Sequence, residues 1–293
     1  MTGSPTTVAP AATVSGRTGR PHTLFAAALV SALALLTLNY GLIDLIDGFT
    51  GIVDQNRNVV LDAGWGAIFG VVLPLGLLAQ LRHPSQRIAG LQQTALVAII
   101  LAGAGLAGRA FWYLGLAAAL LTATGLLLAM HPARGEMLRR GVSPQPLLLG
   151  LGAVAALPCL VYAARMISAQ RRGLPPLDAE SNGMHHWTVM AALGLAVVGL
   201  AILASLGTNG WRISAWSAAL AAIVWGLSSV RAPTAAGAEG SGWAIAAIAW
   251  ALAVLTATVR GRSLPTKKTP RPRKWPGVWT PVGDGDGEFV KMD

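Results

Sequence analysis

The sequence predicts an all-α, polytopic membrane protein: a bundle of about eight transmembrane helices with both termini in the cytoplasm. The first observation is composition, since 54% of the 293 residues are hydrophobic and only 12% are charged. Soluble domains carry about 25% charged residues. The second observation is that the apolar residues gather in stretches of about 18 residues or more, the length needed to cross a hydrocarbon core of about 30 Å. The third is that most basic residues lie between these stretches or in the C-terminal segment.

The elements follow from the N-terminus. Residues 1–22 are rich in Thr, Ala, Pro, Ser and Gly, so we predict a disordered cytoplasmic tail. A transmembrane domain follows over residues 23–260, and its first stretch lacks a small-residue cleavage site, which indicates an uncleaved span. The eight predicted spans are 24–46, 63–81, 88–107, 111–130, 147–167, 187–206, 211–230 and 242–259.

Charge between the spans predicts the orientation. With a cytoplasmic N-terminus, 16 of the 22 Lys and Arg residues fall on the inner side. This agrees with the positive-inside rule and predicts a multi-pass protein of the cell (plasma) membrane. The loop after the fifth span opposes the rule with Arg165, Arg171 and Arg172, and a seven-helix alternative would place the C-terminus outside.

Residues 261–293 form a tail that is basic and proline-rich at first and acidic near its end. We predict that this tail is disordered, cytoplasmic and attracted to anionic lipid of the inner leaflet. The net charge of +10 would suggest a nucleic-acid partner in a soluble protein. Here the positions of the basic residues favour the lipid bilayer as partner, together with a second membrane protein, and no nucleic acid.

Signatures of catalysis are absent from the sequence. The single cysteine, Cys159, excludes an internal disulfide and cysteine-based redox or zinc motifs. Serine-hydrolase, HExxH and phosphate-loop motifs do not occur. The predicted span midpoints carry no ionisable residue, which argues against proton-coupled or ion-coupled carriers. The sequence therefore favours a protein that is not an enzyme, and it identifies no cofactor.

Small residues and prolines predict how the helices pack. Gly66 and Gly70, and the run Gly103, Gly105 and Gly108, would let neighbouring backbones approach closely. Pro74 in the second span and Pro158 in the fifth would bend their helices, because each removes a backbone hydrogen bond.

Ionisable residues gather at the outer helix ends. Tyr40, Asp44 and Asp47 recur at positions i, i+4 and i+7, so they share a helix face. Tyr162 and Arg165 follow Pro158 on one face of the fifth span. The predicted ligand-binding residues, which together would line an outward-facing polar cup, are Tyr40, Asp44, Asp47, Asp62, Tyr162, Arg165, His185 and His186.

Such a cup would bind a divalent cation or a cationic solute, or hold an acid/base pair. The simpler alternative is a set of ordinary solvated helix ends. Adjacent helical residues point about 100° apart, so only one of His185 and His186 is expected to join a ligand set. No metal site is assigned from sequence alone.

Tryptophans also lie near the predicted helix ends. Those assigned to the outer membrane interface are Trp65, Trp112, Trp187 and Trp243, and those assigned to the inner one are Trp211 and Trp216. Interfacial tryptophans form a belt at the headgroup level in many membrane proteins, so this placement needs no ligand to explain it.

Three functional hypotheses follow. The absence of motifs and of mid-membrane charges favours an accessory or assembly component that interacts with another membrane protein. The alternative is a transporter or facilitator for a small or amphipathic solute that enters through the cup. The third hypothesis is a metal-dependent membrane enzyme with an outward-facing site.

Overall fold

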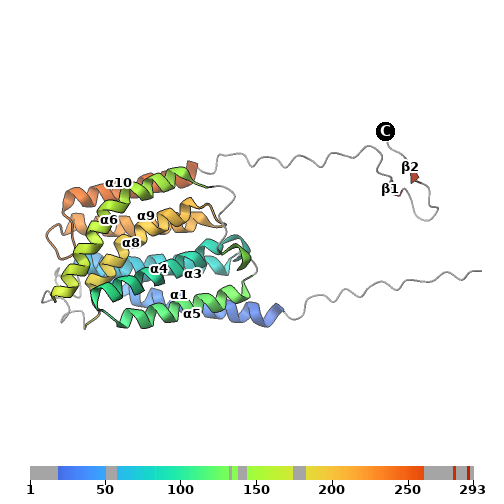
Figure 1. Cartoon of the computed structure of the whole chain (residues 1–293), viewed down its shortest axis with the longest axis horizontal. Coiled ribbons are helices and arrows are strands. Elements are labelled where there is room, and N and C mark those ends of the chain that lie inside the picture. The colour runs from blue at the N-terminus through green and yellow to red at the C-terminus, as the bar shows by residue number, and fades with distance from the viewer. Residues whose placement is uncertain are drawn as a thin grey trace, which may run out of the picture. The chain divides into compact units, whose positions relative to one another are not determined.

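The computed structural model describes residues 19–50, 58–82, 84–131, 134–137, 144–173, 183–260, 280–281 and 289–290. Within these ranges, eight helices are long and apolar enough to cross a membrane, which confirms the predicted helical bundle of a multi-pass membrane protein (Figure 1). The α-helical segments, of which α2 and α3 belong to one span, are α1 (Gly19–Thr50), α2 (Val59–Gly66), α3 (Leu73–Leu78), α4 (Ile88–Gly108), α5 (Trp112–Met130), α6 (Pro146–Arg172), α8 (His186–Ser205), α9 (Trp211–Arg231) and α10 (Ser241–Arg260).

The second span is composite. It runs from Val59 to Leu81 through α2, a π-helical segment η1 (Ala67–Val72), α3 and a 3₁₀ turn η2 (Ala79–Leu81). Two more 3₁₀ turns, η3 (Pro84–Gln86) and η4 (Arg134–Glu136), lie between spans.

The predicted tails lie mostly outside the described residues. The helix α1 begins at Gly19, so residues 19–22 of the predicted tail are helical, and the candidate span itself runs from Thr23 to Thr50. In the C-terminal tail, the described residues are two short strands, β1 (Thr280–Pro281) and β2 (Phe289–Val290). They pair antiparallel, with Thr280 opposite Val290. The predictions of disorder and of lipid contact for the rest of residues 1–18 and 261–293 concern residues outside the described ranges.

Burial separates the eight spans into an inner and an outer group. In the most apolar window of each span, 61% to 83% of the residues are buried for the second span, α4, α8 and α9, against 22% to 33% for α1, α5, α6 and α10. Figure 1 shows α6 and α10 along one edge of the bundle and α1 and α5 along the opposite edge. The core is therefore a four-helix centre with four peripheral helices.

Pro74 explains the irregular middle of the second span. Its ring nitrogen has no N–H to donate to the carbonyl one turn earlier, and the chain there forms the wider π-helical turns of η1. The buried side chain of Gln93 on α4 donates from Nε2 to the Val72 carbonyl at 2.6 Å and to Ser217 Oγ at 2.8 Å. At Pro158, by contrast, α6 continues without interruption from Pro146 to Arg172.

Glycines bring α1 against the second span. Gly41 meets the backbone of Gly70 so closely that a Cβ would have no room. Further along, a Cβ on Gly66 would lie 2.6 Å from the Leu45 Cα, and one on Gly48 would lie 2.8 Å from the Ala63 nitrogen. This confirms the predicted packing role of Gly66 and Gly70.

The glycine run on α4 behaves differently along its length. A Cβ on Gly105 would lie 2.8 Å from the Tyr113 Cβ, and one on Gly108 would lie 2.8 Å from Thr188 Oγ1. Both glycines therefore permit close helix contacts, as predicted. For Gly103 the prediction is wrong, because no atom of the described residues lies within 4 Å of such a Cβ.

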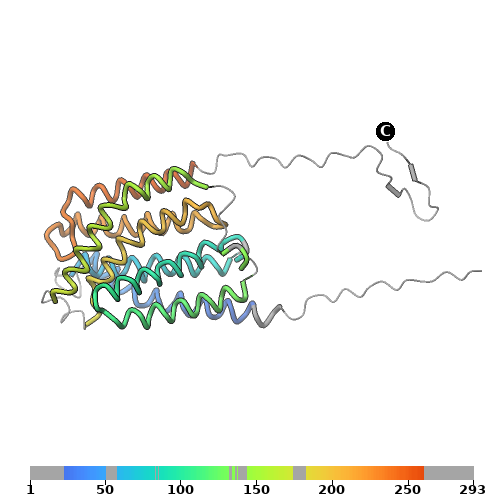
Figure 2. Tube along the Cα trace, in the orientation of Figure 1, coloured from blue at the N-terminus to red at the C-terminus, as the bar shows by residue number. Residues whose placement is uncertain are grey.

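Consecutive spans alternate in direction along the bundle, as the trace in Figure 2 shows. One end of the bundle therefore collects the last turns of α1, α4, α6 and α9 and the first turns of α2, α5, α8 and α10. We call this end, which the charge pattern predicts to face outward, the predicted outer end.

Candidate functional site

Three ionisable residues from three helices converge at the predicted outer end. Asp44 comes from α1, Asp62 from α2 and His186 from α8, and one potential ligand atom of each lies within 4.8 Å of the other two. His186 Nδ1 is 3.4 Å from Asp62 Oδ1. Asp62 and His186 are 7% and 6% exposed. We call these residues the Asp–Asp–His cluster.

Local structure places each member of the cluster. Asp44 lies between Gly41 and Gly48, the two α1 glycines that bring this helix against the second span. Asp62 lies in the first turn of α2, where the unpaired backbone N–H groups of a helix favour a negative charge. His186 is the first residue of α8. The residue before it, His185, has a left-handed backbone (φ 55°), which sets the direction in which the chain enters the helix.

Aromatic rings pack against one side of His186. The Trp65 ring is 5.0 Å from the His186 ring between centroids, and it also packs on Phe69, Trp112 and Tyr113. Trp65 is 2% exposed, and its indole nitrogen has no hydrogen-bond partner among the described residues. One side of the cluster is therefore apolar.

The tryptophan belt predicted from sequence needs correction. Trp112, Trp216 and Trp243 are 41% to 59% exposed, as interfacial residues would be. Trp65, Trp187 and Trp211 are buried inside the bundle. The prediction failed for these three because a helix end at the interface can still turn its side chains toward neighbouring helices.

Five predicted cup residues lie outside the cluster, and three of them are Tyr40, Asp47 and His185. Tyr40 is 52% exposed and faces away from the bundle, because its neighbour Gly41 is the residue that contacts the second span. Asp47 is buried but is not one of the three converging ligands. His185 Nδ1 lies 2.9 Å from Gln170 Nε2 on α6, whereas His186 Nδ1 lies near Asp62. The two adjacent histidines therefore contact different residues, as their angular spacing predicts.

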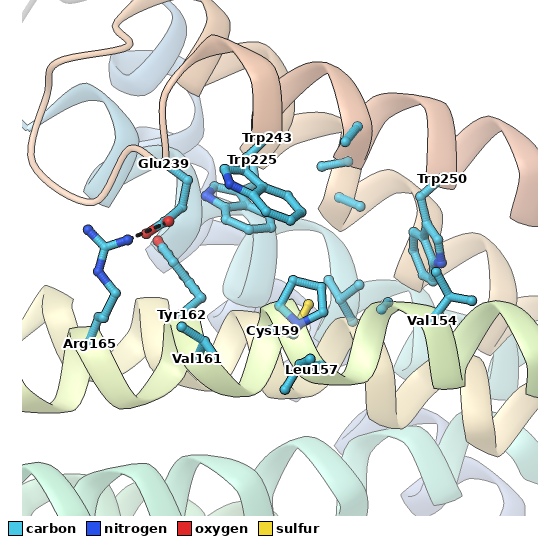
Figure 3. A pocket seen from close by; sticks show the side chains of 16 residues that line it. Val154, Leu157, Cys159, Val161, Tyr162, Arg165, Trp225, Glu239, Trp243 and Trp250 are labelled. Carbon is cyan, nitrogen blue, oxygen red and sulfur yellow. Dashed lines mark hydrogen bonds and ion pairs between the residues drawn. The ribbon is translucent and has the colours of Figure 1, made fainter.

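Tyr162 and Arg165 belong to a second site, which Figure 3 shows in close-up. The Tyr162 hydroxyl donates to the Gly237 carbonyl at 2.8 Å, and its ring packs on Trp225 with 4.7 Å between centroids. Arg165 Nη1 is 2.6 Å from Glu239 Oε2. The single cup predicted from sequence is thus two separate groups of residues.

This second site is one end of an elongated cavity of about 590 Å³. The cavity lies between α6, α9 and α10, and its walls are mostly apolar, with Trp225, Trp243 and Trp250 contributing large ring surfaces. Figure 3 shows the Arg165–Glu239 ion pair at one end of the cavity and Trp250 near the other. We call this cavity the α6–α10 groove.

Glu239 was not identified from sequence. It lies in the α9–α10 connection among Ala and Gly residues, and nothing in that local pattern marks it. Burial raises the pKa of the Glu239 carboxyl above its ordinary value, and the Arg165 guanidinium partly offsets this rise. The sequence offers one indication of its role: an acidic residue in a short apolar connection, such as Glu239, is expected to pair with a basic residue at a nearby helix end.

The Asp–Asp–His cluster has the donor set of a transition-metal site. An imidazole nitrogen and two carboxylate oxygens bind divalent transition metals at about 2.0 to 2.2 Å, which places two donors of one tetrahedral ion about 3.4 Å apart. The Asp62 and His186 atoms already lie 3.4 Å apart. The three ligand atoms together lie within 4.8 Å of one another, so metal binding would draw the set closer together.

Comparisons of the chain with protein-family models, with curated proteins and with solved structures find no match.

Proposed function

We propose that this multi-pass membrane protein binds a divalent transition-metal cation through Asp44, Asp62 and His186, and that its function depends on this metal. The observation that carries the proposal is the convergence of the three side chains from three different helices. Residues that lie 18 and 124 positions apart along the chain come together because the bundle brings them there.

Electrostatics supports a bound cation. Two carboxylates held close together in largely buried surroundings repel each other, and burial weakens the hydration that would otherwise offset this repulsion. A dication bound between them would neutralise both charges. His186 would add a nitrogen donor, which favours zinc, iron or manganese over calcium, since calcium takes six to eight oxygen ligands.

The number of protein ligands favours the metal-dependent enzyme among the three hypotheses. Structural zinc sites use about four protein ligands, whereas catalytic sites use three and leave a position for water or substrate. The Asp–Asp–His cluster offers three. The accessory and transporter hypotheses remain predictions from the sequence, without an observation among the described residues that favours either.

The proposal includes the orientation predicted by the charge pattern. In the plasma membrane, with 16 of 22 basic residues inside, the cluster would open to the outer surface. The substrate would then arrive from outside the cell or from the outer leaflet.

Metal titration tests the proposal. The full-length protein is purified in detergent, stripped with EDTA, dialysed and titrated with Zn²⁺ in a calorimeter. We expect one saturable site per chain, and Asp44→Asn should weaken Zn²⁺ binding by more than about 100-fold, since even residues that only support a ligand contribute 10- to 100-fold.

Asp47→Asn is the matched control, because it removes the same charge from the same helix outside the cluster. It should change Zn²⁺ affinity much less than Asp44→Asn. Equal effects of the two substitutions, or the absence of a saturable site in the unaltered protein, would contradict the proposal.

A further inference from the structure

The α6–α10 groove is bridged at both ends and free of bridging contacts between them within the described residues. At one end, Trp250 Nε1 of α10 donates to the Leu151 carbonyl of α6 at 2.8 Å. At the other end, the α9–α10 connection is tied to α6 by the ion pair of Arg165 with Glu239 and by the Tyr162 hydroxyl. Between these points the two helices leave a cavity instead of packing together.

The length of the groove matches one leaflet of a bilayer. Val154 and Arg165 both line it, and the helix rises about 17 Å from one to the other at about 1.5 Å per residue. Half of a hydrocarbon core of about 30 Å is close to this length. The cavity volume of about 590 Å³ also falls within the range of small-molecule sites, roughly 300 to 1,000 Å³.

The groove opens sideways, away from the bundle. Val154, Leu157 and Trp243 line it and are 72%, 71% and 59% exposed. An extended apolar chain could therefore enter from the lipid phase without any helix moving. The tryptophan rings provide wide contact surfaces for such a chain.

The polar end of the groove offers the Arg165 guanidinium as a positively charged donor group and the Glu239 carboxylate as a negatively charged acceptor group. The Arg165 side chain is 60% exposed, and one of its nitrogens holds Glu239 Oε2, which leaves further guanidinium donors for another anion. Glu239 Oε1 is buried and accepts no hydrogen bond from the described residues. A buried carboxylate oxygen without a donor is costly, so the site is suited to a ligand that brings an N–H group.

We propose that the α6–α10 groove binds one glycerophospholipid with an ethanolamine headgroup. One acyl chain lies along the tryptophan-lined wall, the phosphate accepts hydrogen bonds from Arg165, and the primary ammonium donates to Glu239 Oε1. The groove and the Asp–Asp–His cluster share no residues, so this inference does not rest on the proposed metal site.

Charge complementarity distinguishes this lipid from its neighbours in the membrane. A choline headgroup carries the same charges but has no N–H to donate to Glu239. A glycerol headgroup leaves the lipid with a net negative charge, which the Glu239 carboxylate repels. A second copy of this chain would have to place a complementary charged pair at the same end of the groove.

Native mass spectrometry tests the proposal directly. Delipidated full-length protein in detergent is mixed with equal amounts of three lipids that share palmitoyl and oleoyl chains and carry ethanolamine, choline or glycerol headgroups. We expect the ethanolamine lipid to be retained about tenfold more than the choline lipid, the equivalent of one charge-assisted hydrogen bond.

Two pairs of substitutions test the location of the lipid and the recognition of its headgroup. Ala246→Phe should fill the groove from its exposed wall and abolish the lipid adduct, whereas Ala249→Phe, on the same helix but not lining the groove, should leave it unchanged. Glu239→Gln should retain the fold and reduce the preference for the ethanolamine lipid over the choline lipid, because a neutral amide oxygen accepts the ammonium N–H more weakly than a carboxylate does. Asp47→Asn, which removes a negative charge at the same end of the bundle, should preserve the preference.

The opposite results would overturn the inference. Equal retention of the three lipids by the unaltered protein would show that the headgroup is not recognised. Unchanged adducts in Ala246→Phe would place the lipid elsewhere, and a dimer in place of lipid adducts would assign the groove to a second copy of the chain.

Discussion

The imidazole of His186 and the carboxylate of Asp62 face each other across 3.4 Å, between the first turns of α8 and α2. Both side chains are almost fully buried, and Asp44 of α1 completes the group from a third helix. A cluster of two acids and one imidazole with two of its three side chains buried is unusual at a membrane helix end, where ionisable groups normally reach water. This relationship underlies the proposed metal dependence.

Substitution of His186 should remove metal binding, whereas substitution of the adjacent His185 should preserve it. His186→Gln deletes the only nitrogen donor of the cluster, so Zn²⁺ affinity should fall by more than about 100-fold. His185→Gln alters the contact with Gln170 and leaves the cluster intact. Calorimetric titration of both variants measures the difference, and equal losses would argue against His186 as a ligand.

The glycine contact between α1 and the second span should control both stability and the cluster. Gly41→Ala places a methyl group against the backbone of Gly70, which should cost about 1 to 3 kcal/mol and push Asp44 away from Asp62. The variant should therefore show a lower thermal midpoint and weaker Zn²⁺ binding.

Gly103→Ala is the control for this packing prediction, since open space surrounds its Cβ position within the described residues. It should leave Zn²⁺ binding unchanged and raise stability slightly, because alanine favours helix. If Gly41→Ala were as harmless as Gly103→Ala, the glycines would not be what positions Asp44.

Glu239 predicts a pH dependence of stability. Its pKa is raised in the folded protein, so between the ordinary glutamate value of about 4.3 and the raised value the folded state binds more protons than the unfolded state. The contribution of Glu239 to stability is therefore greatest below this window and decreases as the pH rises through it.

Thermal midpoints of the detergent-solubilised protein, measured from about pH 4 to pH 7, check this prediction. The difference in midpoint between the unaltered protein and Glu239→Gln should change across the window, in favour of the glutamine variant at higher pH. A difference that is constant with pH would contradict the raised pKa.

The orientation prediction can be tested with single cysteines. In a Cys159→Ser background, Ser241→Cys at the start of α10 should react with a membrane-impermeant maleimide added to intact cells, because it lies at the predicted outer end. Gly135→Cys, an exposed position in η4 at the opposite end, should react only after the membrane is opened. Reversed labelling would invert the assigned topology.

Helix number and extent could be predicted from sequence because both depend on local hydropathy, and the eight spans agree with the prediction within about five residues. Side-chain direction at helix ends was less predictable. Tyr40 and Asp44 share a helix face by spacing, yet the tight contact at Gly41 turns Tyr40 outward and Asp44 toward the bundle. This difference depends on which face of α1 packs, which periodicity in a uniformly apolar helix does not indicate.

The candidate sites show the same limit. The predicted cup includes all three residues of the cluster and two that line the groove, but their division between the two sites depends on helix neighbours that the sequence does not state. Two features could not be predicted because each depends on a residue distant in the chain. Glu239 pairs with Arg165, and the buried Trp65 ring packs on His186.

The most direct test of the central claim is the metal content of the protein purified, without chelator, from the membrane in which it is made. Elemental analysis should find one divalent transition-metal ion per chain in the unaltered protein and in His185→Gln, and background levels in His186→Gln. A metal-free unaltered protein that also fails to take up Zn²⁺, or a His186→Gln variant that keeps its full metal content, would contradict the assignment of Asp44, Asp62 and His186 as a metal centre.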